Sequence, residues 1–320
     1  MKRNFFLLCL MCTILSIGCK EINKEQKQTN LSQEHLFRLP EIPNELTDPQ
    51  ERAAYLAEHY WDHLNFADTS LIRKQDLVEP IFADYIGVFP HATYSDACKG
   101  IKKLMSQVTV NPPLFNYFTR LADKYLYDLN SPVHNDEFYI PFLESIIESK
   151  IVDELHKIRF RYQLSMVLKN RPDSIATDFI YTLASGKRAF LSKIDSEYTL
   201  LFFNNPDCGL CGDVREKIIA SQILSNLQHP KDYRLKKLAI LSIYTEDDFG
   251  LWKSQLWKSP SDWICGYDKQ MNIRNRGLYD LRKIPALYLL NHEKRILLKN
   301  TSVEAVEEYF VKHSLQDSSK

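Results

Sequence analysis

The stretch that decides the fold leads from an apolar run into a pair of cysteines: Tyr198-Thr199-Leu200-Leu201-Phe202-Phe203-Asn204-Asn205-Pro206-Asp207-Cys208-Gly209-Leu210-Cys211. An unbroken apolar run of this kind is typical of a strand that is buried on both faces. Apolar residues then recur at helical spacing from about 209 to 226, with Val214 and Ile218 on one row and Ile219 on another. The sequence therefore predicts a strand, a Cys-X-X-Cys motif and a helix in direct succession.

The position of the motif favours redox chemistry. Free backbone N–H groups and the dipole at the start of a helix favour a thiolate on Cys208. Two intervening residues keep the Cys211 thiol close enough to attack a mixed disulfide. A structural disulfide, an inactive remnant of the fold and half of a zinc site are the alternatives. Zinc would need two more ligands, for which Cys265 and His292 are conceivable, but there is no second paired motif. We therefore predict a redox-active pair and no metal.

The segments on either side of the motif indicate an α/β domain over residues 170–320. The order of strand, helix, strand, helix, hairpin and helix predicts a mixed sheet flanked by helices, with Cys265 in a further strand. Strands are expected at 179–183, 188–191, 198–203, 238–244, 286–290 and 295–298, and helices at 209–226, 247–257 and 303–310.

Residues 40–169 show helical periodicity throughout, and short polar or proline-containing breaks join the segments. This pattern predicts an all-α domain ahead of the α/β domain. The last helix is expected at 151–168, with a core stripe of Leu155, Ile158, Tyr162 and Met166. Cys98 lies on another apolar stripe and is expected to be a buried structural thiol.

The N-terminus has the features of a bacterial lipoprotein signal. Lys2 and Arg3 precede an apolar segment too short for an ordinary membrane span. The segment ends in Leu15-Ser16-Ile17-Gly18-Cys19, which resembles a lipobox. We therefore expect a signal peptide at 1–18, a lipid on Cys19 and a flexible polar tether at 19–39. An ordinary secretory signal cut elsewhere is the alternative.

A lipidated Cys19 would place the protein in the cell envelope, where disulfides persist. We expect the periplasmic face of a membrane, although Lys20-Glu21 loosely resembles a signal for export to the cell surface. Cys9 and Cys12 leave with the signal peptide. Four of the seven cysteines then remain for chemistry.

The composition excludes several classes of protein. Lys plus Arg and Asp plus Glu are equal at 41 each, so there is no basic excess to attract a nucleic acid. A hydrophobic content of 44% argues against intrinsic disorder. Only 9 glycines are present, which argues against glycine-rich phosphate loops.

A proline supports the interpretation of the cysteine pair. Ile284-Pro285 directly precedes the strand at 286–290, although a central strand does not normally tolerate proline. With this element the sequence resembles the thioredoxin superfamily, and within it the TlpA/ResA-like extracytoplasmic thiol–disulfide oxidoreductases. The matching segments are Ala176-Thr177-Asp178-Phe179, Gly186-Lys187, 200–211 and 284–290. Residues 40–169 resemble the helical domain of unassigned role that precedes such modules in some Bacteroidota lipoproteins.

The resemblance implies a thioredoxin-like fold and a role for each matching residue. Cys208 would be the attacking thiolate, Cys211 the resolving thiol and Pro285 a cis-proline. The backbone at Ile284 would pair with a substrate strand. Protein thiols and disulfides are the implied substrates, and an electron donor of the DsbD type in the membrane is an implied partner. The Cys208–Cys211 disulfide would be the only redox group, without a separate cofactor.

The departures from the family pattern bear on the reactivity of the pair. Asp207 replaces the usual tryptophan, and a carboxylate there should disfavour a thiolate on Cys208. If Asp207 caps the helix, its charge is partly committed to backbone N–H groups, which leaves the direction of the effect unchanged and its size open. Residues 200–203 lack the buried acid that assists proton transfer in thioredoxin itself. Gly209-Leu210 is not a dipeptide tied to a known potential, so the direction of electron flow stays open. We expect a reductase or isomerase of protein disulfides. The alternative is a non-enzymatic lipoprotein whose helical domain binds a partner protein or peptide.

Overall fold

The computed structural model describes residues 37–230 and 237–317. The predicted signal peptide, Cys19 and most of the predicted tether lie outside the described residues. The chain divides into two compact units, Met1–Arg161 and Tyr162–Lys320. This division falls inside the last helix before the sheet, and the borders predicted at 40–169 and 170–320 stay predictions.

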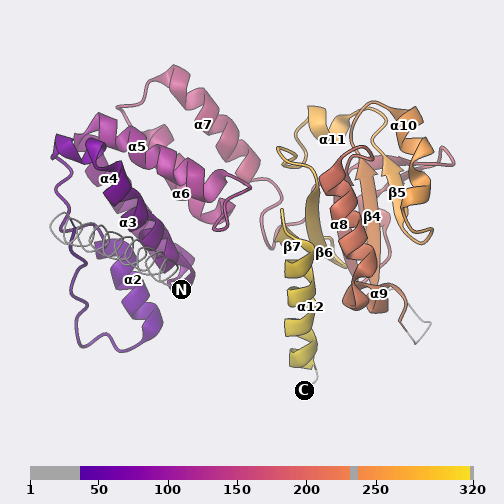
Figure 1. The fold of residues 1–320 in the computed structure, drawn as a ribbon, viewed down its shortest axis with the longest axis horizontal. Coiled ribbons are helices and arrows are strands. Elements are labelled where there is room, and N and C mark those ends of the chain that lie inside the picture. Colours follow the sequence, from indigo (N-terminus) through magenta and orange to yellow (C-terminus); the bar gives the residue numbers. More distant parts are fainter. Residues whose placement is uncertain (1–36, 231–236, 318–320) are drawn as a thin grey trace, which may run out of the picture. The chain divides into compact units, whose positions relative to one another are not determined.

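The first unit is helical, as predicted (Figure 1). Side chains of Asp48, Thr93, Asn111 and Asn135 accept hydrogen bonds from free N–H groups and thereby fix four of the helix starts. The helices are α2 (Pro49–His59), α3 (Gln75–Val88), α4 (Tyr94–Gln107), α5 (Pro112–Ala122), α6 (Asp136–Glu148) and α7 (Glu154–Val167), of which α7 extends into the second unit. Short turns η1 (Thr69–Arg73), η2 (Phe89–His91), η3 (Val108–Val110) and η4 (Asp123–Tyr127) join several of them.

The expected core stripe of α7 is confirmed at Met166, which is buried, and is wrong at its other three positions. Leu155, Ile158 and Tyr162 are 75%, 59% and 61% exposed. The covered face instead carries two polar residues together with Phe160, Met166 and Val167. Lys157 fits on that face because its ammonium group donates a hydrogen bond to Glu154 at 3.0 Å while its stem is covered. Periodicity alone did not distinguish this face from the opposite one.

Cys98 also differs from the prediction, because its side chain is only half-buried in α4. Partial burial raises the pKa of its thiol. The backbone of α4 closely approaches the backbone of α2 two residues further on, at Gly100. A Cβ atom there would lie 2.0 Å from the Ala57 carbonyl oxygen, so glycine is required where α4 crosses α2.

The second unit contains a mixed seven-stranded sheet, which confirms the predicted fold class. Its order is β2-β1-β5-β4-β3-β6-β7. The central strands β3, β4 and β5 are parallel, and all other neighbours are antiparallel. The strands are β1 (Ile180–Leu183), β2 (Arg188–Phe190), β3 (Tyr198–Asn204), β4 (Leu238–Tyr244), β5 (Ile264–Tyr267), β6 (Ala286–Asn291) and β7 (Ile296–Lys299).

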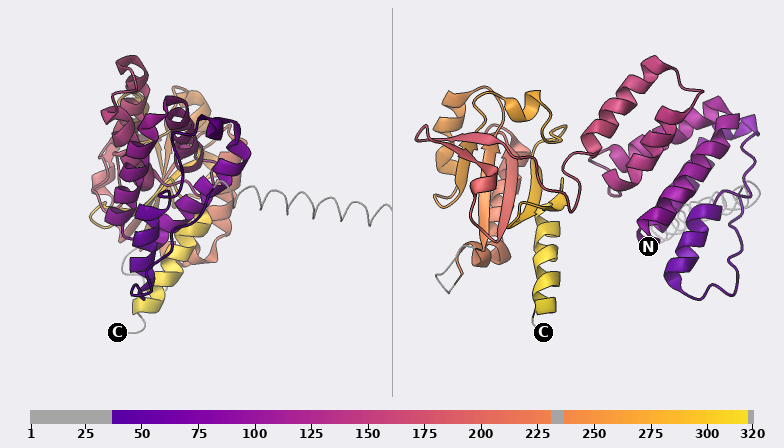
Figure 2. Two further views of the ribbon diagram at one scale, coloured as in Figure 1. Left: turned by 90° about the vertical axis from the view of Figure 1, so that its left-hand side faces the viewer. Right: turned by 180° about the vertical axis from the view of Figure 1, so that it is seen from behind.

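Alternating residues of β3 pack into two cores. Leu200 and Phe202 contact the helices α8 (Gly209–Ala220), α9 (Gln222–Gln228) and α12 (Val303–Asp317) on one face of the sheet (Figure 1). Leu201 and Phe203 pack on the other face beneath the segment 176–194, which the right-hand view of Figure 2 shows from behind. This two-sided burial explains why the strand is continuously apolar.

Two predicted helices are shorter than expected. The helix from 209 breaks at Ser221, whose hydroxyl accepts a hydrogen bond from Leu224 N at 3.2 Å and caps α9. Ile219, on the second apolar row of the predicted helix, is 42% exposed. The segment at 247–257 contains α10 (Phe249–Ser254) and the turn η6 (Leu256–Lys258), and a short α11 (Asn272–Asn275) follows β5. Within the described residues, no helix combines the length and hydrophobicity needed to cross a bilayer.

Candidate active site

Cys208 is the residue immediately before α8, at the carboxyl end of β3. Its Sγ accepts a hydrogen bond from Cys211 N at 3.3 Å, so the sulfur itself caps the helix. Its own N–H donates to Asn205 O at 3.1 Å. The side chain is half-buried and therefore reachable from solvent. A sulfur in this position receives the N–H groups and the positive end of the helix dipole, which favour a negative charge.

Asp207 is exposed and lies one residue outside the helix. Since Cys208 provides the cap of α8, the alternative in which Asp207 caps the helix is wrong. The Asp207 N–H donates to Asn205 Oδ1 at 3.0 Å, which holds the turn before the motif. The carboxylate of Asp207 therefore does not cap α8 and lies next to Cys208 in the chain, in the position predicted for a modulating charge.

Cys211 occupies the first turn of α8 and is fully buried. Asn205 N donates a hydrogen bond to its Sγ at 3.4 Å. The pKa of this thiol is raised to about 12, chiefly by burial and also by the hydrogen bond to Cys208, while the Asn205 N–H and the Arg215 charge act in the opposite direction. Both cysteines are free thiols in this structure. The pair therefore combines an accessible sulfur with a buried, protonated one.

Ile284-Pro285 lies beside this pair. The peptide bond is cis, as the resemblance implies. Pro285 directly precedes β6, whose first residue Ala286 pairs with Phe203 of β3. This register brings Ile284 O to 4.0 Å from Cys208 Sγ. The structure therefore places Cys208, Cys211, Ile284 and Pro285 in one site.

Comparison with solved structures identifies the family of the chain. A thioredoxin-like protein from Bacteroides caccae is 42% identical to this chain, with a TM-score of 0.82. The match covers 87% of this chain and 98% of that protein. The chain belongs to the thioredoxin-like proteins.

Further comparisons concern the two units of this thioredoxin-like protein separately. A family model described as a domain of unknown function (DUF5106) matches residues 17–170. The C-terminal domain of an uncharacterised protein from Bacteroides fragilis is 41% identical, and the match covers 44% of this chain and 96% of that domain, with a TM-score of 0.42. The thioredoxin domain of a thiol–disulfide oxidoreductase from Bacteroides vulgatus is 18% identical over 45% of this chain and 97% of that domain, with a TM-score of 0.38. No curated protein matches the chain.

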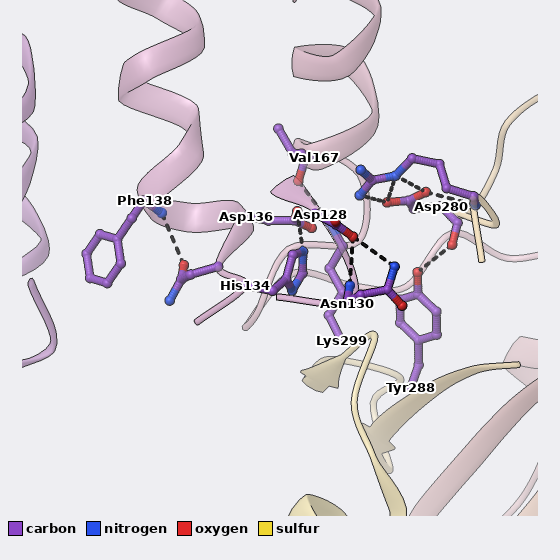
Figure 3. Close-up of polar contacts among 11 residues, drawn as sticks. Asp128, Asn130, His134, Asp136, Phe138, Val167, Asp280, Tyr288 and Lys299 are labelled. Atoms are coloured by element: carbon purple, nitrogen blue, oxygen red, sulfur yellow. Dashed lines mark hydrogen bonds and ion pairs between the residues drawn. The ribbon is translucent and has the colours of Figure 1, made fainter. Parts of the chain in front are cut away.

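A buried carboxylate supports the segment that leads to Ile284. The side chain of Asp280 is fully buried and forms an ion pair with Arg282. Figure 3 shows Asp280 above Tyr288, whose hydroxyl donates to Asp280 O at 3.5 Å. Arg282 N also donates to Asp280 Oδ1 at 3.2 Å. These contacts tie residues 280–282 to β6 of the thioredoxin-like unit, just before the residues that lie beside Cys208.

The sequence analysis missed one residue beneath the motif, Arg215. Residues 200–203 are all buried and apolar, so β3 offers no acid to Cys211. Arg215 follows Cys211 by four residues on the same buried row of α8, and it is only 6% exposed. That spacing was a usable signal, because residues at i and i+4 share one helix face.

The remaining candidate ligands do not join the motif. Cys265 lies in β5, as predicted, and burial raises the pKa of its thiol. His292 follows the end of β6 opposite to the one beside Cys208, and its Nδ1 lies 3.2 Å from Ser196 O. In the part of the chain that the structure describes, no three His, Cys, Asp or Glu residues are grouped to hold a metal ion.

Proposed function

We propose that this thioredoxin-like protein is a thiol–disulfide oxidoreductase that acts on protein disulfides as a reductase or isomerase. The observation that supports it best is the position of Cys208 Sγ. It caps α8, it lies one turn from the Cys211 thiol, and it lies 4.0 Å from Ile284 O. A reactive sulfur, a resolving sulfur and a backbone acceptor beside them are the parts that disulfide exchange on a polypeptide requires.

The exchange proceeds in two steps. The Cys208 thiolate attacks one sulfur of a substrate disulfide, and the other substrate sulfur leaves as a thiolate. Cys211 then loses its proton to solvent and attacks Cys208 Sγ, which breaks the mixed disulfide and releases the second substrate thiolate. Two electrons pass to the substrate, and the Cys208–Cys211 disulfide remains. An electron donor of the DsbD type in the membrane would reduce it again.

The test of this activity is covalent trapping in the full chain. Cys211→Ala should accumulate mixed disulfides between Cys208 and proteins of its host, and purified wild type should catalyse the reduction of insulin by dithiothreitol. Cys265→Ala is the matched control, because it removes another thiol of the same unit. If no Cys208-dependent adducts form and insulin reduction is not accelerated, the enzymatic proposal is wrong. A Cys208→Ser/Cys211→Ser variant that keeps full function in the host would then favour the partner-binding alternative.

We further propose that a lipid on Cys19 anchors the protein in the cell envelope, on the periplasmic face of a membrane. The proposal rests on the sequence around Cys19. Cys19→Ser should move the protein from the detergent phase to the aqueous phase in Triton X-114 partitioning of host cells. An unchanged partition would contradict the anchor, and proteolysis of intact cells would distinguish the cell surface from the periplasm.

A further inference from the structure

Arg215 is an unusual residue for the interior of a protein. It lies on the buried row of α8 with Cys211 and Ile218. Its Nε is buried without a hydrogen-bond partner. Among the described residues, no acidic side chain forms an ion pair with it. Arginine is rarely buried unless it is paired, because removing an uncompensated cation from water is unfavourable.

The groups that this charge reaches are thiols. Cys211 lies one helical turn before Arg215, and Cys265 packs into the same hydrophobic core from β5. The positive charge lowers the pKa of both thiols, against the effect of burial. Cys208 is the other titratable group that acts on Cys211, and an ionised Cys208 opposes a second negative charge there. Across the residues that the structure describes, this cation therefore acts on thiols and forms no ion pair with a carboxylate.

The redox state of the pair decides whether Arg215 has an anionic partner. In the Cys208–Cys211 disulfide neither sulfur carries a charge, and Arg215 stays uncompensated. When Cys211 ionises to attack a mixed disulfide, a negative charge forms on the same helix face. Opposite charges in a site of low dielectric interact more strongly than in water. The arginine therefore stabilises the state from which the second step of the exchange proceeds.

We propose that Arg215 is a positioning residue for this resolving step, where its buried charge stabilises the Cys211 thiolate. The inference rests on the proposed function and assigns a residue to one of its two steps. In that step the Cys211 proton passes to solvent, a bond forms between the sulfurs of Cys211 and Cys208, and the bond from Cys208 to the substrate sulfur breaks. Because β3 provides no acid to accept the proton, the charge left on Cys211 must be stabilised by another group.

The test separates the two steps with a chromogenic aromatic disulfide, dithiobis(nitrobenzoate). The reduced protein, in a Cys98→Ser/Cys265→Ala background, releases one nitrothiobenzoate when Cys208 attacks and a second when Cys211 resolves. Stopped-flow absorbance between about pH 6 and pH 10 gives both rates. We expect Arg215→Met to slow the second phase about tenfold at each pH, which displaces its pH–rate profile upward by about one pH unit. The first phase should change less than about twofold, because Cys208 is bound to the free N–H groups of the helix.

Two further variants complete the test. Arg215→Lys keeps the charge and should retain most of the second-phase rate, whereas Arg215→Gln should behave like Arg215→Met. A merely structural arginine would lower the melting temperature in all three variants without displacing the pH–rate profile of the second phase. Should Arg215→Met not fold, Arg215→Gln and Arg215→Lys provide the same contrast. A wild-type second phase in Arg215→Met or Arg215→Gln would overturn the inference about Arg215. Failure of wild type to reduce insulin, with both phases present, would count against the proposed function instead.

Discussion

Helices α7 and α8 each bury a cation, and the two differ in what surrounds the charge. Lys157 of α7 is 7% exposed and Arg215 of α8 is 6% exposed. Lys157 donates a hydrogen bond to the Glu154 carboxylate at 3.0 Å, so its charge is paired within one turn of its own helix. Arg215 has no such partner in the part of the chain that the structure describes, and its charge acts on the thiols of Cys211 and Cys265. Equal burial therefore says little about the role of a charged residue, whereas the nature of its neighbours says much.

The largest expected effect concerns the reactive cysteine at the start of α8, which has no counterpart in α7. Cys208→Ser replaces the reactive sulfur with a weak nucleophile, so insulin reduction should fall at least about a hundredfold. The matched control is Cys98→Ser in the helical unit, which should change the rate less than about twofold. Near-wild-type turnover by Cys208→Ser would remove the contrast between the helices, because α8 would then carry no chemistry.

The second prediction uses the titration of Cys211. Its folded-state pKa of about 12 lies above the value of 9.0 for an unperturbed thiol. A raised pKa of an acidic group gives stability that is complete below the unfolded value and is lost as the pH rises toward the folded value. The free energy of unfolding of the reduced protein should therefore fall more steeply above about pH 9 than that of Cys211→Ala, as measured by urea denaturation. Parallel pH profiles would contradict the buried, protonated Cys211.

The third prediction compares the two cations directly. Lys157→Met should leave insulin reduction within about twofold of wild type, because its charge is paired with the Glu154 carboxylate. Arg215→Met should reduce turnover under conditions in which the resolving step limits the rate. Steady-state assays of both variants at one pH measure the difference. Equal losses in the two variants would mean that the charge of Arg215 acts only through the fold.

The smallest expected effect concerns Asp207, which is exposed beside Cys208. Asp207→Asn removes a negative charge next to the forming thiolate and should accelerate the first phase with dithiobis(nitrobenzoate) about twofold at low salt. Raising the ionic strength should reduce the difference, since an exposed charge is screened. Glu216→Gln, a charge change further along α8, is the control. A slower first phase in Asp207→Asn would mean that the carboxylate supports Cys208 and does not oppose it.

Much of the α/β unit could be predicted because each of its strands has a local signature. The apolar runs at 198–203 and 238–244 and the proline before 286 fixed the order of strands around the motif. The position of the site depends on this strand order, because the pairing of Phe203 with Ala286 brings Ile284 close to Cys208. The exposed stripe of α7 could not be predicted, because apolar and covered residues alternate around that helix at similar spacing. Arg215 was missed because burial of a cation depends on neighbours from β3 and β5 that are distant in sequence.

Asn205 contacts both residues of the cysteine pair, so its amide group can report their redox state. Its N–H donates to the Cys211 sulfur, its carbonyl accepts from Cys208 N, and its side chain accepts from Asp207 N. Forming a disulfide changes the acceptor of that N–H from a thiol sulfur to a bridged one, while the surrounding backbone stays in place. The Asn205 amide is therefore a spectroscopic reporter. Its nitrogen and proton NMR resonances should follow the redox state of the pair during a redox titration, without a probe attached to either cysteine.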